Sequence, residues 1–239
     1  MAMGGDDFVF KDVCDLLRKN RINFWICHGT LLGIIRENRL LPWDHDIDFA
    51  VWDHETDKNY IIDIMLSHGY QQEAITEDMD CLHFVGEEKK VDISFYKIKD
   101  NVASIKWAVY PTDIIGRLMV FVSNNISKNN DEISNNYSIP KKVLLTIIRR
   151  FSLVLGFVLP NNLKNIINKQ AMKKIKYTGY SYPLEIMQIK NIEYAGIKIP
   201  VPFDSEACLK HTYGKDWKTP QKNYIWYEEA DNLIDMRMK

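Results

Sequence analysis

Hydrophobic and polar positions follow two different periods along the first half of the chain. Apolar residues recur every three to four positions over residues 8–20 and 55–68, which predicts two amphipathic helices. Short apolar stretches bounded by polar turns predict strands at residues 22–27, 44–52, 81–85, 91–98 and 102–110. We therefore expect an α+β fold in which helices flank a β-sheet.

The pattern changes in the second half. Residues 123–138 (SNNISKNNDEISNNYS) are rich in Asn and Ser, which is typical of a loop or linker. Residues 140–176 have a mostly helical pattern and contain nine Lys and Arg but no Asp or Glu. We expect a catalytic core over residues 1–122, a polar linker over 123–139, and a mostly helical part over 140–239 that packs on the core as one unit.

Composition excludes several classes of protein. The 239-residue chain has a net charge of −1, which argues against a general binder of polyanions such as nucleic acid. Its four scattered cysteines form no CxxC pair, so we expect buried free thiols in a reducing compartment and no zinc site. The first ten residues do not have the pattern of a signal peptide, and no apolar run reaches the roughly 18 residues of a spanning helix. These features favour a cytoplasmic protein.

Candidate metal ligands lie at the start of one predicted strand. Asp44, Asp46 and Asp48 are spaced by two, so in a strand their carboxylates project from one face while Ile47 and Phe49 point into the core. Grouped carboxylates repel one another, and hard divalent cations such as Mg²⁺ or Mn²⁺ relieve that repulsion.

Asp92 is the best candidate for a further carboxylate, because it is the one acid in the apolar strand predicted over residues 91–98. Burying it without a partner would cost about 2–7 kcal/mol or more. Each motif has a plainer interpretation. In the plainer interpretation, residues 44–48 form a polar turn after Pro42, and Asp92 is a structural acid that accepts hydrogen bonds from backbone N–H groups. Mg²⁺ does not favour imidazole, so we expect His28, His45 and His83 to have structural or supporting roles.

A candidate phosphate-binding turn precedes these acids. Gly29 allows the chain to turn, and Thr30 then lies at the N-terminus of a short predicted helix, where free N–H groups favour phosphate. Gly33 would let that helix lie close to the sheet or to a nucleotide, and Arg36 would offer a fork of donors. The alternatives are that Thr30 is a simple helix N-cap and that Arg36 is a surface ion-pair partner.

These motifs together resemble a known family. The string GTLLG at residues 29–33, followed by Arg36 and by PWDHDID at residues 42–48, closely resembles the signature of the LicD/fukutin family, which belongs to the nucleotidyltransferase-fold superfamily. A second resemblance, to the family's tail motif, lies at residues 201–203 and 213–220. Residues 102–190 match no motif that we recognise.

The resemblance implies a nucleotidyltransferase-like mixed β-sheet core and a metal-dependent phosphotransferase. Such an enzyme moves phosphocholine, ribitol phosphate or glycerol phosphate from a CDP-linked donor to a sugar hydroxyl of a glycan and releases CMP. The resemblance maps the metal-binding and catalytic acids onto Asp46, Asp48 and Asp92, with Mg²⁺ or Mn²⁺ as the cofactor. The expected substrate-binding residues are Gly29, Thr30, Gly33, Arg36, Trp43 and Asp44. Animal relatives can carry a cysteine-based zinc loop, which the scattered cysteines here do not support.

Two other functions remain open at this stage. The same acids would serve a nucleotidyltransferase that adds NMP to a small molecule, or a non-catalytic relative that binds nucleotide or glycan. The expected partners are a CDP-linked donor and a glycan or lipid-linked glycan, but no nucleic acid.

The basic stretch at residues 140–176 also has three interpretations. It lies on an anionic membrane, with Leu144, Ile148, Phe151 and Leu155 inserted, or it binds a phosphate-rich glycan. The third interpretation is a core helix pair with solvated Lys and Arg faces.

Overall fold

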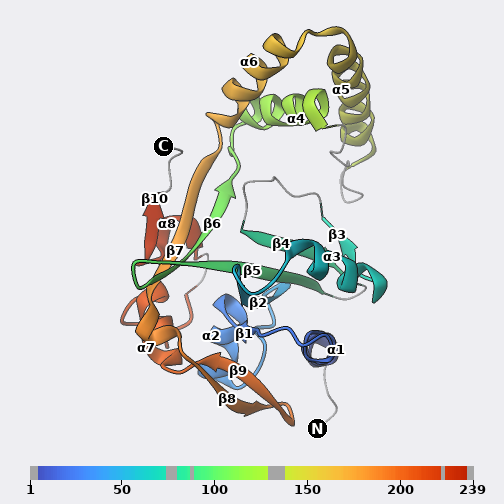
Figure 1. Cartoon of the computed structure of the whole chain (residues 1–239). Coiled ribbons are helices and arrows are strands. Elements are labelled where there is room, and N and C mark those ends of the chain that lie inside the picture. The colour runs from blue at the N-terminus through green and yellow to red at the C-terminus, as the bar shows by residue number, and fades with distance from the viewer. Residues whose placement is uncertain (1–4, 74–79, 87–88, 129–137, 222–223, 236–239) are drawn as a thin grey trace. The chain divides into compact units, whose positions relative to one another are not determined.

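The structure of the protein is a computed structural model, and it describes residues 5–73, 80–86, 89–128, 138–221 and 224–235 (Figure 1). The chain divides into two compact units. We call residues 1–107 with 178–238 the core unit, and residues 108–177 the helical unit. The chain therefore leaves the core unit after Trp107 and returns to it at Thr178.

The core unit contains most of the strands. Strand β6 ends two residues after the limit at Trp107, and strand β7 begins two residues before the limit at Thr178. In chain order the elements are α1 (Gly5–Lys19), β1 (Trp25–Ile26), α2 (His28–Glu37), β2 (Asp46–Trp52), α3 (Lys58–Ser67), β3 (Gln71–Gln72), β4 (Cys81–Val85), β5 (Lys90–Lys99), β6 (Val102–Val109), β7 (Lys176–Pro183), a 3₁₀ turn η1 (Leu184–Met187), β8 (Ile189–Tyr194), β9 (Ile197–Pro202), α7 (Ser205–Tyr213), α8 (Trp226–Glu229) and β10 (Leu233–Asp235).

The main sheet is mixed. Its strands follow the order β1-β2-β5-β6-β7-β10, with β4 also paired to β5 and β3 paired to β4. Strands β2 and β5 run parallel, whereas β1 with β2 and β4 with β5 run antiparallel. Strands β8 and β9 form a separate two-stranded sheet. The expected α+β class with a mixed sheet flanked by helices is confirmed.

Alternation along β2 separates the core from the carboxylates. Ile47, Phe49 and Val51 are fully buried in one hydrophobic cluster. Helices α1 and α3 pack into the same cluster, through residues that include Phe10 and Met65. Asp46 and Asp48 therefore project from the opposite face of the strand, as the spacing by two predicted.

The opposite face of the sheet carries a second, more aromatic cluster. It contains Trp25, Tyr96, Ile105, Tyr180 and Tyr182. Gly179 makes this arrangement possible, because a Cβ at that position would overlap the carbonyl oxygen of Ile105 on β6. The sequence K-Y-T-G-Y-S-Y at residues 176–182 has the alternation of a strand, with the small Gly179 where two strands approach closely.

The helical unit consists of α4 (Ile114–Lys128), α5 (Ile139–Val158) and α6 (Asn161–Met172), and α4 contacts both of the others. The expected linker over residues 123–139 is wrong at its start, because residues 123–128 complete α4. Val120 and Ile126 are buried there, and the Ser123 hydroxyl donates to the Asn168 side chain on α6 over 3.2 Å. Residues 129–137 of that linker lie outside the described residues.

The expected division at residues 122 and 140 also differs from the two units. Residues 176–202 contain β7, β8 and β9, so the part from 140 to 239 is not mostly helical. Strand β7 joins the main sheet, which assigns the chain after residue 177 to the core unit. Within the described residues, we find no helix with the length and apolar character that a membrane crossing requires.

Candidate active site at the start of two parallel strands

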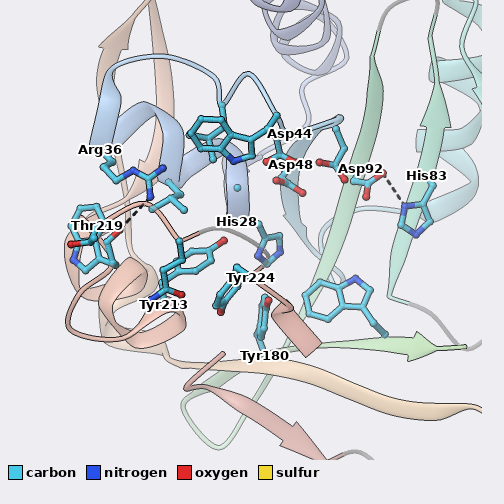
Figure 2. A pocket seen from close by; sticks show the side chains of 18 residues that line it. His28, Arg36, Asp44, Asp48, His83, Asp92, Tyr180, Tyr213, Thr219 and Tyr224 are labelled. Carbon is cyan, nitrogen blue, oxygen red and sulfur yellow. Dashed lines mark hydrogen bonds and ion pairs between the residues drawn. The ribbon is translucent and has the colours of Figure 1, made fainter. Parts of the chain in front are cut away.

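Three carboxylates gather where β2 begins. Asp46 and Asp48 lie on β2, and Asp44 lies in the turn just before it. One carboxylate oxygen from each comes within 4.8 Å of the other two. Figure 2 shows Asp44 and Asp48 on the same wall of a cavity. The close group is therefore Asp44, Asp46 and Asp48, and Asp44 belongs to it as fully as the two residues predicted to bind metal.

Asp92 stands next to this group on the neighbouring strand. It is the register partner of Asp48 across the parallel β2–β5 pair. On its other side it pairs in register with His83 of β4, and His83 Nδ1 lies 2.8 Å from Asp92 Oδ1. Asp92 also forms a second group of possible metal ligands with His83 and Cys81. The structure thus brings all the sequence-predicted acids together, and His83 contacts Asp92 (Figure 2).

Burial and mutual repulsion raise the pKa values of these carboxyl groups. Burial, together with the charges of Asp46, Asp44 and Asp92, raises the pKa of Asp48 well above its ordinary range. Burial and the neighbouring Asp46 raise the pKa of Asp44 to about 7. Burial also raises the pKa of Asp92, against the opposing effect of His83. An all-oxygen group whose anionic form is this unfavourable fits a hard divalent cation, which would remove the repulsion.

The N-terminus of α2 is directed at one of these carboxylates. The Thr30 N–H and hydroxyl both donate to Asp48 Oδ2, at 3.2 and 3.3 Å, and the Thr30 hydroxyl accepts from the Asp48 N–H at 2.8 Å. Thr30 is buried, and it is not among the residues that line the cavity. Its visible role is therefore to hold Asp48. The N-cap position belongs to Cys27, so the alternative of Thr30 as N-cap is wrong.

Two glycines make close approaches around α2. Gly29 lines the cavity, and a Cβ there would overlap Asp44 Oδ2, so this position keeps room for the carboxylate. Gly33 faces the other way. A Cβ at Gly33 would come within 2.6 Å of the Arg39 carbonyl and 3.0 Å of the Leu41 side chain. Gly33 thus allows the turn after α2 to fold back on the helix, and it does not line the cavity.

Arg36 lines the cavity and is partly committed to other residues. Its Nε and Nη2 donate to Glu37 Oε1 at 3.1 and 2.7 Å, and its Nη1 donates to the Trp217 carbonyl at 3.4 Å. These bonds use three of the five guanidinium N–H groups. Arg36 therefore ties α2 to the segment around Trp217 and keeps two donors for a ligand.

The cavity has a volume of about 520 Å³ and a strongly aromatic lining. Trp43, predicted to bind substrate, lines the cavity and is exposed. The opposite wall holds Tyr180, Tyr213 and Tyr224 (Figure 2). The tail resemblance pointed to residues 213–220, which supply Tyr213, Trp217 and Thr219. Trp107 and Tyr180 were missed, and the alternation around Gly179 was the available signal for Tyr180.

His28 is a further residue that the sequence did not single out for binding. Its ring lies 5.3 Å from the rings of both Trp107 and Tyr180, and its Nε2 is 3.4 Å from the Tyr96 hydroxyl. Its Nδ1 is buried without a hydrogen-bond partner among the described residues. Burial lowers the pKa of His28 to about 4, so the imidazole is neutral at pH 7.

Comparison with known families decides the relationship. The family model described as "LicD/FKTN/FKRP, nucleotidyltransferase domain" matches residues 21–162, more than half of the chain. The chain belongs to the LicD/FKTN/FKRP family. The LicD match contains all four acids, the Gly29–Thr30 turn and Arg36, and its description agrees with the nucleotidyltransferase-like core expected from the signature.

Two curated relatives of this LicD chain are themselves uncharacterized. The uncharacterized protein RT0683 of Rickettsia typhi is 32% identical over 108 residues, which is 44% of this chain and 33% of that protein. The uncharacterized protein RP689 of Rickettsia prowazekii is 44% identical over 43 residues, or 18% of this chain and 16% of that protein. The aligned parts span a third or less of these relatives.

Among solved structures, the lincosamide antibiotic adenylyltransferase LnuA in its lincomycin-bound form aligns at 11% identity. The alignment covers 88% of this chain and 87% of LnuA, with a TM-score of 0.43. The identity and the TM-score are too low for this alignment to inform the site.

Proposed function

We propose that this protein transfers a phospho-alcohol from a CDP-linked donor to a sugar hydroxyl of a glycan, with a divalent cation as cofactor and CMP as the leaving product. Membership of the LicD family supports a transferase of substituted phosphate groups. The observation that carries the proposal is the group of carboxylates at Asp44, Asp46 and Asp48, which faces an aromatic wall across one cavity.

The carboxylates divide into two roles in this proposal. Asp44, Asp46 and Asp48 hold Mg²⁺ or Mn²⁺, which supplies charge neutralisation and orientation of the donor phosphates. This differs from the expected set Asp46, Asp48 and Asp92, because Asp44 completes the close group. Asp92 is then available to accept the proton of the sugar hydroxyl, and His83 holds its carboxylate in place.

The rest of the site positions the two substrates. Thr30 and the N-terminus of α2 fix Asp48, and Arg36 offers its two remaining donors to phosphate oxygens. Asp92 accepts the proton of the sugar hydroxyl as the hydroxyl oxygen attacks the phosphorus atom of the transferred group. A new P–O bond forms, and the P–O bond between that phosphorus and CMP breaks. Most of the rate then comes from positioning and preorganised charge, as in other phosphoryl transfers.

The aromatic wall indicates the chemistry of the transferred group and the acceptor. Aromatic rings suit a quaternary ammonium group such as that of choline, or a sugar ring. The cavity offers such rings from Tyr180, Tyr213 and Tyr224 on this wall and from Trp43 elsewhere in its lining. Glycan and donor are thus recognised largely by stacking, while the phosphates are recognised by charge.

A thermal-shift screen followed by product analysis tests the proposal. CDP-choline, CDP-ribitol, CDP-glycerol and common NTPs are each added with Mg²⁺ or Mn²⁺. A ligand at 100 times its Kd stabilises the native protein by about 2.7 kcal/mol. We expect one CDP-linked alcohol to raise the melting temperature only with the metal, and turnover to release CMP. Stabilisation by NTPs alone, with release of pyrophosphate, would instead indicate NMP transfer. If none of these nucleotides raises the melting temperature, the result would indicate a non-catalytic relative.

A further inference from the structure

The helical unit leaves a long apolar stripe exposed. On α5, the exposed apolar side chains recur every three to four residues, so they lie on one side of the helix. They are Val143, Leu144, Ile147, Phe151, Val154, Phe157 and Val158. Phe151 is 63% exposed and Phe157 is 90% exposed. Single exposed apolar residues are ordinary on a protein surface, but a continuous stripe of this kind marks an interaction site.

The other side of α5 is already used. Ser152 is fully buried, and Gly156 approaches α4 so closely that a Cβ there would be 2.7 Å from the Ile126 carbonyl. Ile148 and Leu155, expected from the sequence to insert into a membrane, are only partly exposed. Packing against α4 therefore accounts for the small residues of α5 and leaves the large exposed ones unexplained.

The part of the chain that contains the stripe carries charges of one sign. Between Ile139 and Lys176 the chain has nine basic residues and no acidic one: Lys141, Lys142, Arg149, Arg150, Lys164, Lys169, Lys173, Lys174 and Lys176. Arg150 is itself exposed on α5, next to Phe151. A second copy of this unit would bring like charges together, which disfavours self-association. An apolar stripe on a helix that also exposes basic side chains such as Arg150 is complementary to a layer of anionic headgroups above acyl chains.

We infer that α5 docks this protein on an anionic lipid bilayer, with its helix axis in the plane of the surface and the stripe from Val143 to Val158 inserted below the headgroups. Within the described residues we found no helix suited to crossing a membrane, in keeping with a helix that lies on the surface. The inference goes beyond the proposed function, since binding to lipid requires neither a donor nor an acceptor.

Vesicle flotation with the 239-residue chain tests this inference. Neutral phosphatidylcholine vesicles are compared with vesicles that contain about 30% phosphatidylglycerol, at about 50 and 500 mM salt. We expect the protein to float with the anionic vesicles at low salt, to bind them less at high salt, and to leave neutral vesicles unbound.

Matched variants locate the contact. Phe151→Gln with Phe157→Gln should lower the bound fraction about tenfold or more, because two large inserted side chains are lost. Phe8→Gln is the control: Phe8 is 66% exposed on α1 of the core unit, and its replacement should leave binding unchanged. Arg150→Gln should weaken binding on the order of fivefold, whereas Lys99→Gln on β5 should not. Melting temperatures report whether each variant is folded.

Several results would overturn the inference. One is a wild-type protein that stays unbound by anionic vesicles at low salt. Another is a folded stripe variant that floats as well as the wild type, or a Phe8→Gln variant that is equally impaired. A third is a wild-type dimer that the stripe substitutions convert to a monomer in the absence of lipid binding, which would assign the stripe to contact between copies. Binding to a soluble anionic polymer without binding to vesicles would indicate a phosphate-rich glycan instead.

Discussion

The core unit and the helical unit carry opposite chemistry at the two places for which we propose a function. In the core unit, acidic side chains gather inside a cavity behind aromatic walls. In the helical unit, apolar side chains of α5 face outward, and the charged residues of the unit are mostly basic. Residues 108–177 contain eleven Lys and Arg against three Asp and Glu, although the whole chain has a net charge of −1. A balanced total charge therefore conceals an acidic unit and a basic one, and the argument from net charge against a polyanion partner does not extend to the helical unit.

The largest expected effect is confined to the core unit. Asp48→Asn should lower the rate of CMP release about 1,000-fold, because a buried ligand of the proposed cation loses its charge. The same change removes a carboxylate whose pKa is raised by burial and by its neighbours, so the melting temperature without metal should not fall. Asp63→Asn, at an exposed position of α3, is the control and should keep full activity. Equal turnover in the Asp48→Asn variant would remove the catalytic proposal.

Thr30 should have a smaller effect through Asp48. Thr30→Val loses the hydroxyl that bonds Asp48 in both directions, so we expect metal affinity to fall about 10- to 100-fold. The variant also leaves the buried Asp48 N–H unpaired, which costs about 1–3 kcal/mol of stability. Thr30→Ser should recover most of the metal affinity. A Thr30→Val protein that binds metal as tightly as the wild type would show that Thr30 has only a packing role.

Substitutions that abolish CMP release and substitutions that abolish vesicle binding should act independently. Phe151→Gln with Phe157→Gln should change CMP release with a water-soluble acceptor less than about twofold, as expected for exposed substitutions outside the site. Asp48→Asn should float with anionic vesicles as well as the wild type does. Loss of turnover in the stripe variant, measured without lipid, would mean that the helical unit contributes to the reaction itself.

The smallest effect concerns pH. Asp44 has its pKa raised from 3.8 to about 7, so between these values the folded protein keeps a proton that the unfolded chain has released. Stability without metal should therefore decrease as the pH rises from about 4 to about 7. We expect the melting temperature in a chelator to follow that decrease, and Asp44→Asn to make the decrease smaller, since the raised pKa values of Asp48 and Asp92 act in the same direction. Added Mg²⁺ should restore the melting temperature at pH 8. A chelated protein whose stability rises over this range would contradict the assigned electrostatics.

The sequence predicted the local features of the site better than its long-range partners. Alternation around Asp46 and Asp48 placed Ile47 and Phe49 in the core, and the structure agrees. The same spacing grouped Asp44 with these two acids, and the structure keeps it in the group although it lies in the turn before β2; only the family resemblance had put Asp92 in its place as a metal ligand. Thr30 was expected to contact phosphate, but a carboxylate 18 residues away occupies its donors. No local pattern encodes such a partner.

The aromatic wall shows the same limit more strongly. Trp107 and Tyr180 lie on β6 and β7, which neighbour each other in the sheet although the helical unit separates them in the sequence. Pairing across an insertion of that length leaves no periodic signal. The linker over residues 123–139 was misjudged for a different reason: the Asn and Ser content outweighed the helical spacing by three of Val120, Ser123 and Ile126, all of which are buried in α4.

Binding of Mn²⁺ tests the central claim most directly, because free Mn²⁺ gives a strong electron paramagnetic resonance signal that decreases when the ion is bound. The wild-type protein should decrease this signal in the presence of CDP, and Asp48→Asn and Asp44→Asn should each restore it, whereas Asp63→Asn should behave as the wild type. A wild-type protein that leaves the signal unchanged, or an Asp48→Asn variant that decreases it as much as the wild type, would contradict a cation site at these carboxylates.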